Sequence, residues 1–340
     1  RPLPHAAGRY GLYRMVFALS YLWHVSEFDL RALFGAPSGP EPFLPFLQLL
    51  PASPSMGFLQ GVDVLLVLSL FLLAAGIRVP LSTALVLVVG LIREALLSEY
   101  GVENGNLMPI VFIPLLALVA PGWGHTYSID AWSAQRRGEA PVSPANDSWR
   151  YALTVRSVLI LLAVLFPMAG WFKVTGDGTW LRYDDLLPML LLRRSVDSVV
   201  MGWWANPLGP WLSAHASIGY WLQIGVVAFE LSFVLLLAGT TARRMLFAAL
   251  LVFHAVSALW VMVSFGGMLA AYALFVDWES LWQRVRGLAV ADILRRPFVA
   301  LGPHRCLAVV CIVAAVVTLS LIHISEPTRL RRISYAVFCL

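Results

Sequence analysis

Long apolar runs separated by short polar segments dominate the hydrophobic pattern of the chain. An α-helix of about 20 mostly apolar residues crosses the roughly 30 Å hydrocarbon core of a bilayer. About nine runs (eight to ten) approach this length, although the fourth and the eighth are short: 10–28, 58–76, 81–97, 107–121, 152–172, 216–238, 245–264, 267–282 and 305–321. The pattern predicts an all-α fold, a polytopic transmembrane helical bundle.

Glycine-containing breaks separate several neighbouring runs. The segments 76–80 and 239–244 and the pair Gly266-Gly267 each predict a tight turn between helices. Longer polar or mixed connections cover 35–55, which is rich in proline, and 173–215, which is rich in tryptophan.

The basic residues predict the orientation of the bundle. With the N-terminus inside, the inner loops carry thirteen arginines. The outer loops then carry five basic residues, namely Arg31, Lys173, Arg182, Arg193 and Arg194. Because an excess of positive charge in short loops marks the cytoplasmic side, we expect the N-terminus to lie inside. The expected location is the bacterial plasma (inner) membrane, which the chain crosses several times.

Composition excludes several classes of protein. Charged residues make up 13% of the chain, whereas a soluble domain carries about a quarter. The net charge of +5 comes from basic residues scattered at the ends of apolar runs, so we expect no nucleic-acid partner. The three cysteines form no C-x-x-C pair, which disfavours thiol redox chemistry. No metal site is predicted.

The last residues differ in character from the rest of the chain. Residues 320–340 resemble translated vector read-through. We therefore expect one transmembrane domain over 1–319 and a non-native tail over 320–340, and no function is assigned to the tail.

Ionisable residues inside apolar runs are candidates for function, since each costs about 2.5–3.5 kcal/mol at the centre of a membrane helix. Glu230 lies nine residues before Gly239, and His254 lies ten residues after Arg244. Both are therefore about 14 Å from the same inner turn. This predicts either a buried proton-handling pair or a structural hydrogen bond that fixes the helix registry.

Lys173 is the only lysine among the 24 basic residues. Unlike arginine, a desolvated lysine can lose its proton and act as a base. Lys173 follows the run 152–172, which places it at the outer membrane boundary, and Arg93-Glu94 approach the same level about 18 Å along their own run. The alternative is an interfacial lysine that extends its amine to water.

Several segments resemble the HTTM family, the membrane domain shared with vitamin K-dependent γ-glutamyl carboxylase. The resemblance covers roughly residues 8–282. The similar segments are Gly11-Leu-Tyr-Arg14, Asn104-Gly-Asn106, Tyr127-Ser-Ile-Asp130, Ala169–Trp180 with Lys173 inside it, Glu230 and Phe253-His254.

The resemblance implies chemistry for Lys173. In the animal carboxylase the matching lysine is regarded as the base that deprotonates reduced vitamin K, so a reduced quinone of the vitamin K or menaquinone type is the implied cofactor. This sequence departs from that enzyme in two ways. It has no histidine near Asn104–Asn106, and the large lumenal domain that binds the substrate is absent from these 340 residues.

Two functions remain open from the sequence. The first is an enzyme with quinone or lipid chemistry at an outer-facing pocket, with Lys173 as base and Glu230 and His254 as further catalytic candidates. The second is a transporter or partner-binding membrane component in which Glu230 and His254 form a proton or structural pair. Besides the bilayer, the expected partners are a quinone or lipid-like ligand and a protein. The substrate-binding candidates are Arg14, Arg93, Glu94, Asn104, Asn106 and Trp180.

Overall fold

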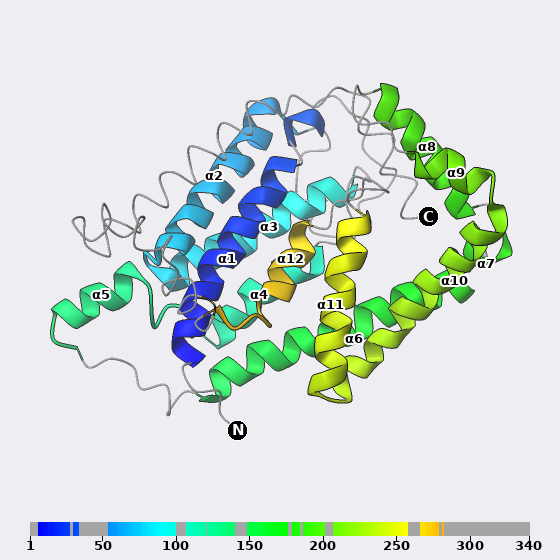
Figure 1. Cartoon of the computed structure of the whole chain (residues 1–340). Helices are drawn as coiled ribbons and strands as arrows, with labels where there is room; N and C mark the ends of the chain where they lie inside the picture. The colour runs from blue at the N-terminus through cyan, green and yellow to red at the C-terminus, as the bar shows by residue number, and fades with distance from the viewer. Residues whose placement is uncertain are drawn as a thin grey trace, which may run out of the picture. The chain divides into compact units, whose positions relative to one another are not determined.

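A computed structural model gives the arrangement of the helices (Figure 1). It describes residues 6–27, 30–33, 54–99, 107–120, 122–139, 148–175, 179–183, 186–200, 207–257, 266–278 and 281. Every regular element in these ranges is a helix, and no strand occurs in them. The chain divides into two units, of which the first comprises Arg1–Val155 with Gly266–Leu340 and the second Arg156–Phe265.

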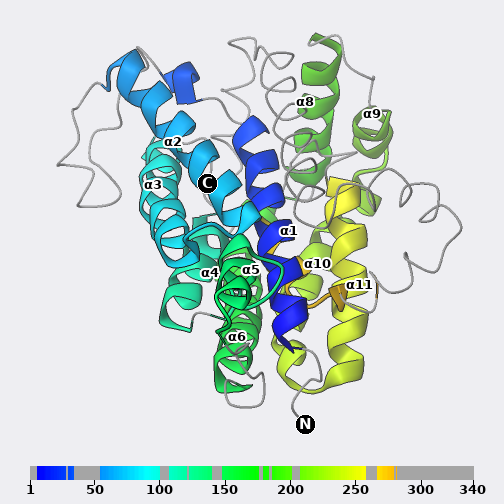
Figure 2. The same cartoon turned by 90° about the vertical axis from the view of Figure 1, so that its left-hand side faces the viewer.

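The first unit is a group of packed helices. Its elements are α1 (Ala6–Glu27), η1 (Leu30–Leu33), α2 (Met56–Ala75), α3 (Val79–Glu99), α4 (Leu107–Val119), α5 (Ile129–Arg136), the start of α6 (Ser148–Thr175) and α12 (Gly266–Ala273). Helix α1 packs against α2 and α12, and α3 packs against α2 and α4. The antiparallel α2–α3 pair is visible from both directions (Figures 1 and 2).

The turn between α2 and α3 confirms one predicted break. Gly76 ends α2 in the left-handed conformation, with φ of 71°, which glycine adopts without steric cost. The next helix begins at Val79, and its exposed amides bond to a side chain from a distant segment. The carboxylate of Asp130 accepts hydrogen bonds from the main-chain N–H groups of Arg78, at 2.9 Å, and Val79, at 2.8 Å.

The second unit contains the remaining part of α6 and the helices that follow it. They are α7 (Thr179–Arg182), α8 (Leu186–Val200), α9 (Leu208–Ser213), α10 (Ala216–Leu231), η3 (Ser232–Leu237) and α11 (Thr240–Val256). Helix α10 packs against α7, α8 and α9, and α11 packs against η3. The predicted break at 239–244 is confirmed, because η3 ends at Leu237 and α11 begins at Thr240.

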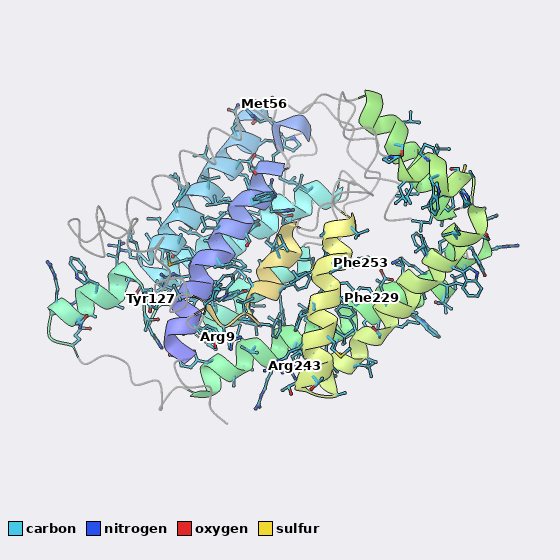
Figure 3. The ribbon with its side chains drawn as sticks, viewed as in Figure 1. Arg9, Met56, Tyr127, Phe229, Arg243 and Phe253 are labelled. Atoms are coloured by element: carbon cyan, nitrogen blue, oxygen red, sulfur yellow. The ribbon has the colours of Figure 1, made fainter. Side chains whose placement is uncertain are left out.

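Aromatic contacts fix the registry within the second unit. Phe166 of α6 stacks on Phe233 of η3, with ring centroids 4.2 Å apart. Phe229 of α10 meets Phe253 of α11 at 5.2 Å, and the two lie together in Figure 3. A β-carbon at Gly170 would lie 3.1 Å from the β-carbon of Glu230. The end of α6 and the segment of α10 and η3 therefore run antiparallel at close range.

Four described helices are long and apolar enough to cross a membrane: Met56–Ala75, Val79–Leu97, Tyr151–Thr175 and Ala216–Leu237. Helix α1 is not among them, since Arg9, Arg14 and His24 make it less apolar. The predicted run 305–321 lies outside the described residues. The all-helical class is confirmed, with four helices that could span a membrane, while nine spans and an inside N-terminus stay predictions.

Candidate functional site

Lys173 lies two residues before the C-terminal end of α6. Its side chain is 26% exposed. The neighbouring Trp171, Phe172 and Val174 are exposed apolar residues, which in a membrane helix contact lipid. The amine therefore lies where a group dissolved in the bilayer can approach it.

Glu230, near the end of α10, is the partner of Lys173. The Lys173 amine donates hydrogen bonds to both carboxylate oxygens of Glu230, at 2.7 and 2.8 Å. The Glu230 side chain is 9% exposed. The sequence predicted Lys173 at the outer boundary and Glu230 deeper, at the level of His254. This depth assignment is corrected, because the antiparallel registry places Gly170 against Leu231 and so brings Lys173 level with Glu230.

Trp180 completes the surroundings of the amine. It belongs to the short helix α7, and its indole ring centroid lies 5.4 Å from the Lys173 nitrogen. A cation within about 6 Å of a tryptophan ring centroid is attracted by the ring's quadrupole. The sequence named Lys173, Glu230 and Trp180 separately, and the structure brings all three together.

Gln223 of α10 is a site residue that the sequence interpretation missed. Its side-chain amide donates to the carbonyl oxygens of Trp180, at 2.6 Å, and Tyr183, at 3.0 Å. Its side-chain oxygen accepts from the main-chain N–H of Leu187 at 2.8 Å. The available signal was a glutamine in an apolar run, two helical turns before Glu230.

His254 occupies a neighbouring part of the second unit. It is buried in α11, with its ring centroid 5.4 Å from that of Phe253 and 6.4 Å from that of Phe166. Phe166 and Phe229 both contact Phe233, which follows Glu230 closely in the chain. Glu230 is hydrogen-bonded to Lys173, and the Glu230–His254 pair stays a prediction.

The Lys173–Glu230 arrangement has the parts of a proton-transfer site. The amine and the carboxylate are at hydrogen-bond distance, so a proton can pass from the ammonium group to the carboxylate without a bridging water. The neutral amine that results is a general base. The indole of Trp180 supplies an aromatic wall beside that base.

A second polar cluster lies in the first unit and joins α1, α2 and α3. Arg93 donates from Nη1 to Glu94 Oε1 at 2.8 Å and from Nε to Asp63 Oδ1 at 3.0 Å. Glu94 also lies 3.0 Å from Nε2 of His24 and accepts from the hydroxyl of Tyr21 at 3.3 Å. His24, Arg93 and Glu94 are fully buried. The sequence named Arg93 and Glu94 as substrate-binding candidates and missed the other three.

This cluster has a structural explanation. A buried charge is expensive unless it is paired and hydrogen-bonded, and here one residue of α2, two of α1 and two of α3 satisfy each other. Arg93 and Glu94 belong to the first unit and Lys173 to the second.

Arg14, another substrate-binding candidate, binds main-chain oxygens. Its guanidinium donates to the carbonyls of Trp123, at 2.6 Å, and of Tyr127, and more weakly to those of Ala74 and Thr126. It is fully buried. These contacts tie α1 to the segment before α5 and to the end of α2. The remaining candidates, Asn104 and Asn106, lie outside the described residues.

Comparison with known proteins found no similar protein. No protein-family model, curated protein or solved structure matches the chain. Within the described ranges, His, Cys, Asp and Glu side chains form no group of three or more that could hold a metal ion. Functional assignment therefore rests on the chemistry of the Lys173 site.

Proposed function

We propose that this chain is a multi-pass enzyme of the bacterial plasma membrane in which Lys173 deprotonates a reduced quinone or a similar lipid-borne hydroxyl compound. The observation that carries the proposal is the bidentate contact between the Lys173 amine and the Glu230 carboxylate beside Trp180. Two apolar helices, Tyr151–Thr175 and Ala216–Leu237, supply the pair.

The proposed step has two proton transfers. The ammonium group of Lys173 first gives a proton to Glu230 Oε1, 2.7 Å away, which leaves a neutral amine and a carboxylic acid. The amine then takes the hydroxyl proton of the ligand and becomes ammonium again, and the ligand becomes its anion. Glu230 is thus the acceptor that frees the base, and Lys173 is the group that contacts the ligand.

The surroundings favour an apolar ligand with a flat ring. Trp171 and Phe172, which precede Lys173 in the chain, are exposed, so this end of α6 presents aromatic surface to its surroundings. The ring of Trp180 lies beside the amine, and aromatic rings associate in offset-stacked or edge-to-face arrangements. A quinone headgroup on an isoprenoid chain has the required shape and solubility. The family resemblance supports the same class of ligand.

The test is consumption of reduced menaquinone by the protein in lipid nanodiscs. The quinol anion passes two electrons to O₂, which gives quinone and hydroperoxide, and the anion is oxidised faster than the neutral quinol. We therefore expect the wild-type protein to accelerate oxygen-dependent quinol consumption above the rate in empty nanodiscs. Lys173→Arg should lower the enzymatic rate by roughly 100-fold or more, the usual contribution of a general base. Arg137→Lys is the matched control, since Arg137 is exposed in an ion pair with Glu139 outside the site. Full activity of Lys173→Arg would contradict the base role.

Proton-coupled transport is the alternative, and one observation favours it. Glu230 and His254 are both buried, and the ring contact of Phe229 with Phe253 links their elements. Proton uptake into liposomes that is lost in Glu230→Gln but kept in Lys173→Arg would support transport and contradict the enzymatic proposal.

A further inference from the structure

Gln223 of α10 makes three side-chain hydrogen bonds to the segment that carries Trp180. It is fully buried, and a buried amide costs free energy unless its polar atoms are bonded. Its Nε2 donates to two carbonyl oxygens, of Trp180 and Tyr183, and its Oε1 accepts from the N–H of Leu187. All three partners belong to the segment between α6 and α10.

The spacing on α10 places Gln223 and Glu230 on one face. Seven residues correspond to nearly two full turns, so the two side chains project in the same direction about 10 Å apart along the helix. Both are buried, as is Val227 between them. This face of α10 therefore holds two partners. Glu230 holds Lys173, and Gln223 holds Trp180.

Trp180 is attached to Gln223 at two points. Its carbonyl oxygen accepts from the Gln223 side chain at 2.6 Å, and its indole Nε1 donates to the Gln223 carbonyl at 3.5 Å. The first bond comes from the Gln223 side chain and fixes the main chain of α7. The second uses the main-chain carbonyl of Gln223, which any residue at this position supplies. The same ring lies 5.4 Å from the Lys173 nitrogen. The Gln223 side chain therefore acts on the indole by fixing the main chain of α7 that carries Trp180.

We propose that Gln223 is the positioning residue of the Lys173 site, which holds the Trp180 indole over the amine and so sets the aromatic wall against which a flat, apolar ring binds. This inference rests on the proposed function for the identity of the ligand. The positioning of Trp180 itself can be tested without it.

The only lysine of the chain makes a direct measurement possible. Acetylation by N-hydroxysuccinimidyl acetate, followed by peptide mass spectrometry, reports on Lys173 alone in the intact protein in nanodiscs. The amino-terminal group serves as the internal reference for reagent concentration. Gln223→Leu keeps the volume and removes the three hydrogen bonds. We expect it to raise the acetylation rate of Lys173 by about fivefold, the size of an ordinary cation–π contact.

A double-mutant cycle separates positioning from general destabilisation. Trp180→Ala should raise the acetylation rate to the same extent, and Gln223→Leu should add nothing in the Trp180→Ala background, because Gln223 acts through Trp180. Gln223→Asn keeps the amide group on a side chain that is one methylene shorter. Its acetylation rate should lie between those of the wild-type protein and Gln223→Leu. This variant provides the test if Gln223→Leu does not fold. Gln60→Leu, at an exposed glutamine of α2, is the matched control.

Two results would overturn the inference. The first is a wild-type acetylation rate in a folded Gln223→Leu or Gln223→Asn protein. The second is an additive effect of Gln223→Leu on Trp180→Ala. Neither result depends on quinol consumption, so failure of the quinol assay with the expected acetylation pattern would contradict the proposed ligand and leave the positioning role intact.

Discussion

Three basic side chains, Arg14, Arg93 and Lys173, show how single residues are accommodated in this chain. Arg14 binds main-chain carbonyls, Arg93 binds two carboxylates, and Lys173 binds one carboxylate next to an indole. The first two are fully buried, and their partners are fixed parts of the helix packing. Lys173 is half-buried, and this partial access makes it the candidate for chemistry.

Removal of Arg93 should be severely destabilising. Arg93→Leu leaves Glu94 and Asp63 without the guanidinium that binds both. Loss of one partner from a buried ion pair costs about 3–5 kcal/mol because the remaining charge is uncompensated. We expect a loss of this size in the free energy of unfolding, measured by denaturant titration in detergent micelles.

The control for this prediction is an exposed pair of the same type. Arg137 and Glu139 are 2.7 Å apart, with side chains 62% and 56% exposed. Arg137→Leu should change the free energy of unfolding by less than about 1 kcal/mol. Equal losses of unfolding free energy for Arg93→Leu and Arg137→Leu would show that burial does not strengthen the ion pairs of Arg93.

At the scale of elements, a residue from a distant segment binds the free main-chain N–H groups at the start of a helix. The tight turn between α2 and α3 leaves the first amides of α3 exposed, and Asp130, some fifty residues later, accepts from two of them. The main-chain N–H of Asp130 in turn donates to the carbonyl of Gly76 at 3.0 Å. We call this pair of contacts between the start of α3 and the segment around Asp130 the Asp130 clasp; its role is structural.

Asp130→Ala should weaken this clasp. The substitution removes a charged acceptor from a helix N-terminus, where capping interactions are worth about 0.5–2 kcal/mol. We expect a loss in that range in the free energy of unfolding, and a smaller loss for Asp130→Asn, which keeps one acceptor oxygen. Glu139→Gln, outside the clasp, serves as the control. An unchanged stability of Asp130→Ala would contradict the clasp.

At the scale of the whole molecule, helix α6 is the element on which the predicted membrane orientation can be tested. Residues 151–175 of this helix are long and apolar enough to cross the bilayer. The polar segment around Arg137 precedes it, and Tyr183 follows it. The basic-residue bias predicts that the first side is inside and the second outside.

Cysteine labelling of intact cells tests this orientation. In a background where Cys306, Cys311 and Cys339 are replaced by serine, Tyr183→Cys should react with a membrane-impermeant maleimide added outside. Arg137→Cys should react only after permeabilisation. Both positions are exposed, at 51% for Tyr183 and 62% for the Arg137 side chain, so burial does not explain a difference. If Arg137→Cys reacted from outside and Tyr183→Cys did not, the predicted orientation would be wrong. If both reacted from outside, α6 would not span the membrane.

The members of the candidate site differ in how far the sequence could predict them. Lys173 was recognisable as the only lysine, and Glu230 as a carboxylate in an apolar run. Their pairing was not, because it depends on the offset between α6 and α10. Distance from the nearest turn placed Glu230 at the depth of His254, whereas side-chain packing at Gly170 sets the actual registry. Gln223 was missed because a neutral amide carries no charge that marks it.

The sequence by itself determined the class of the protein. Runs of about 20 apolar residues must form helices in a bilayer, since no water is present there to satisfy the main-chain polar groups. Breaks at glycine were equally readable, because the left-handed conformation at Gly76 favours that residue. Only the tertiary structure decided which polar side chains meet. Lys173 and Glu230 are 57 residues apart, and such a contact depends on the packing of small and aromatic side chains between helices, which no local pattern encodes.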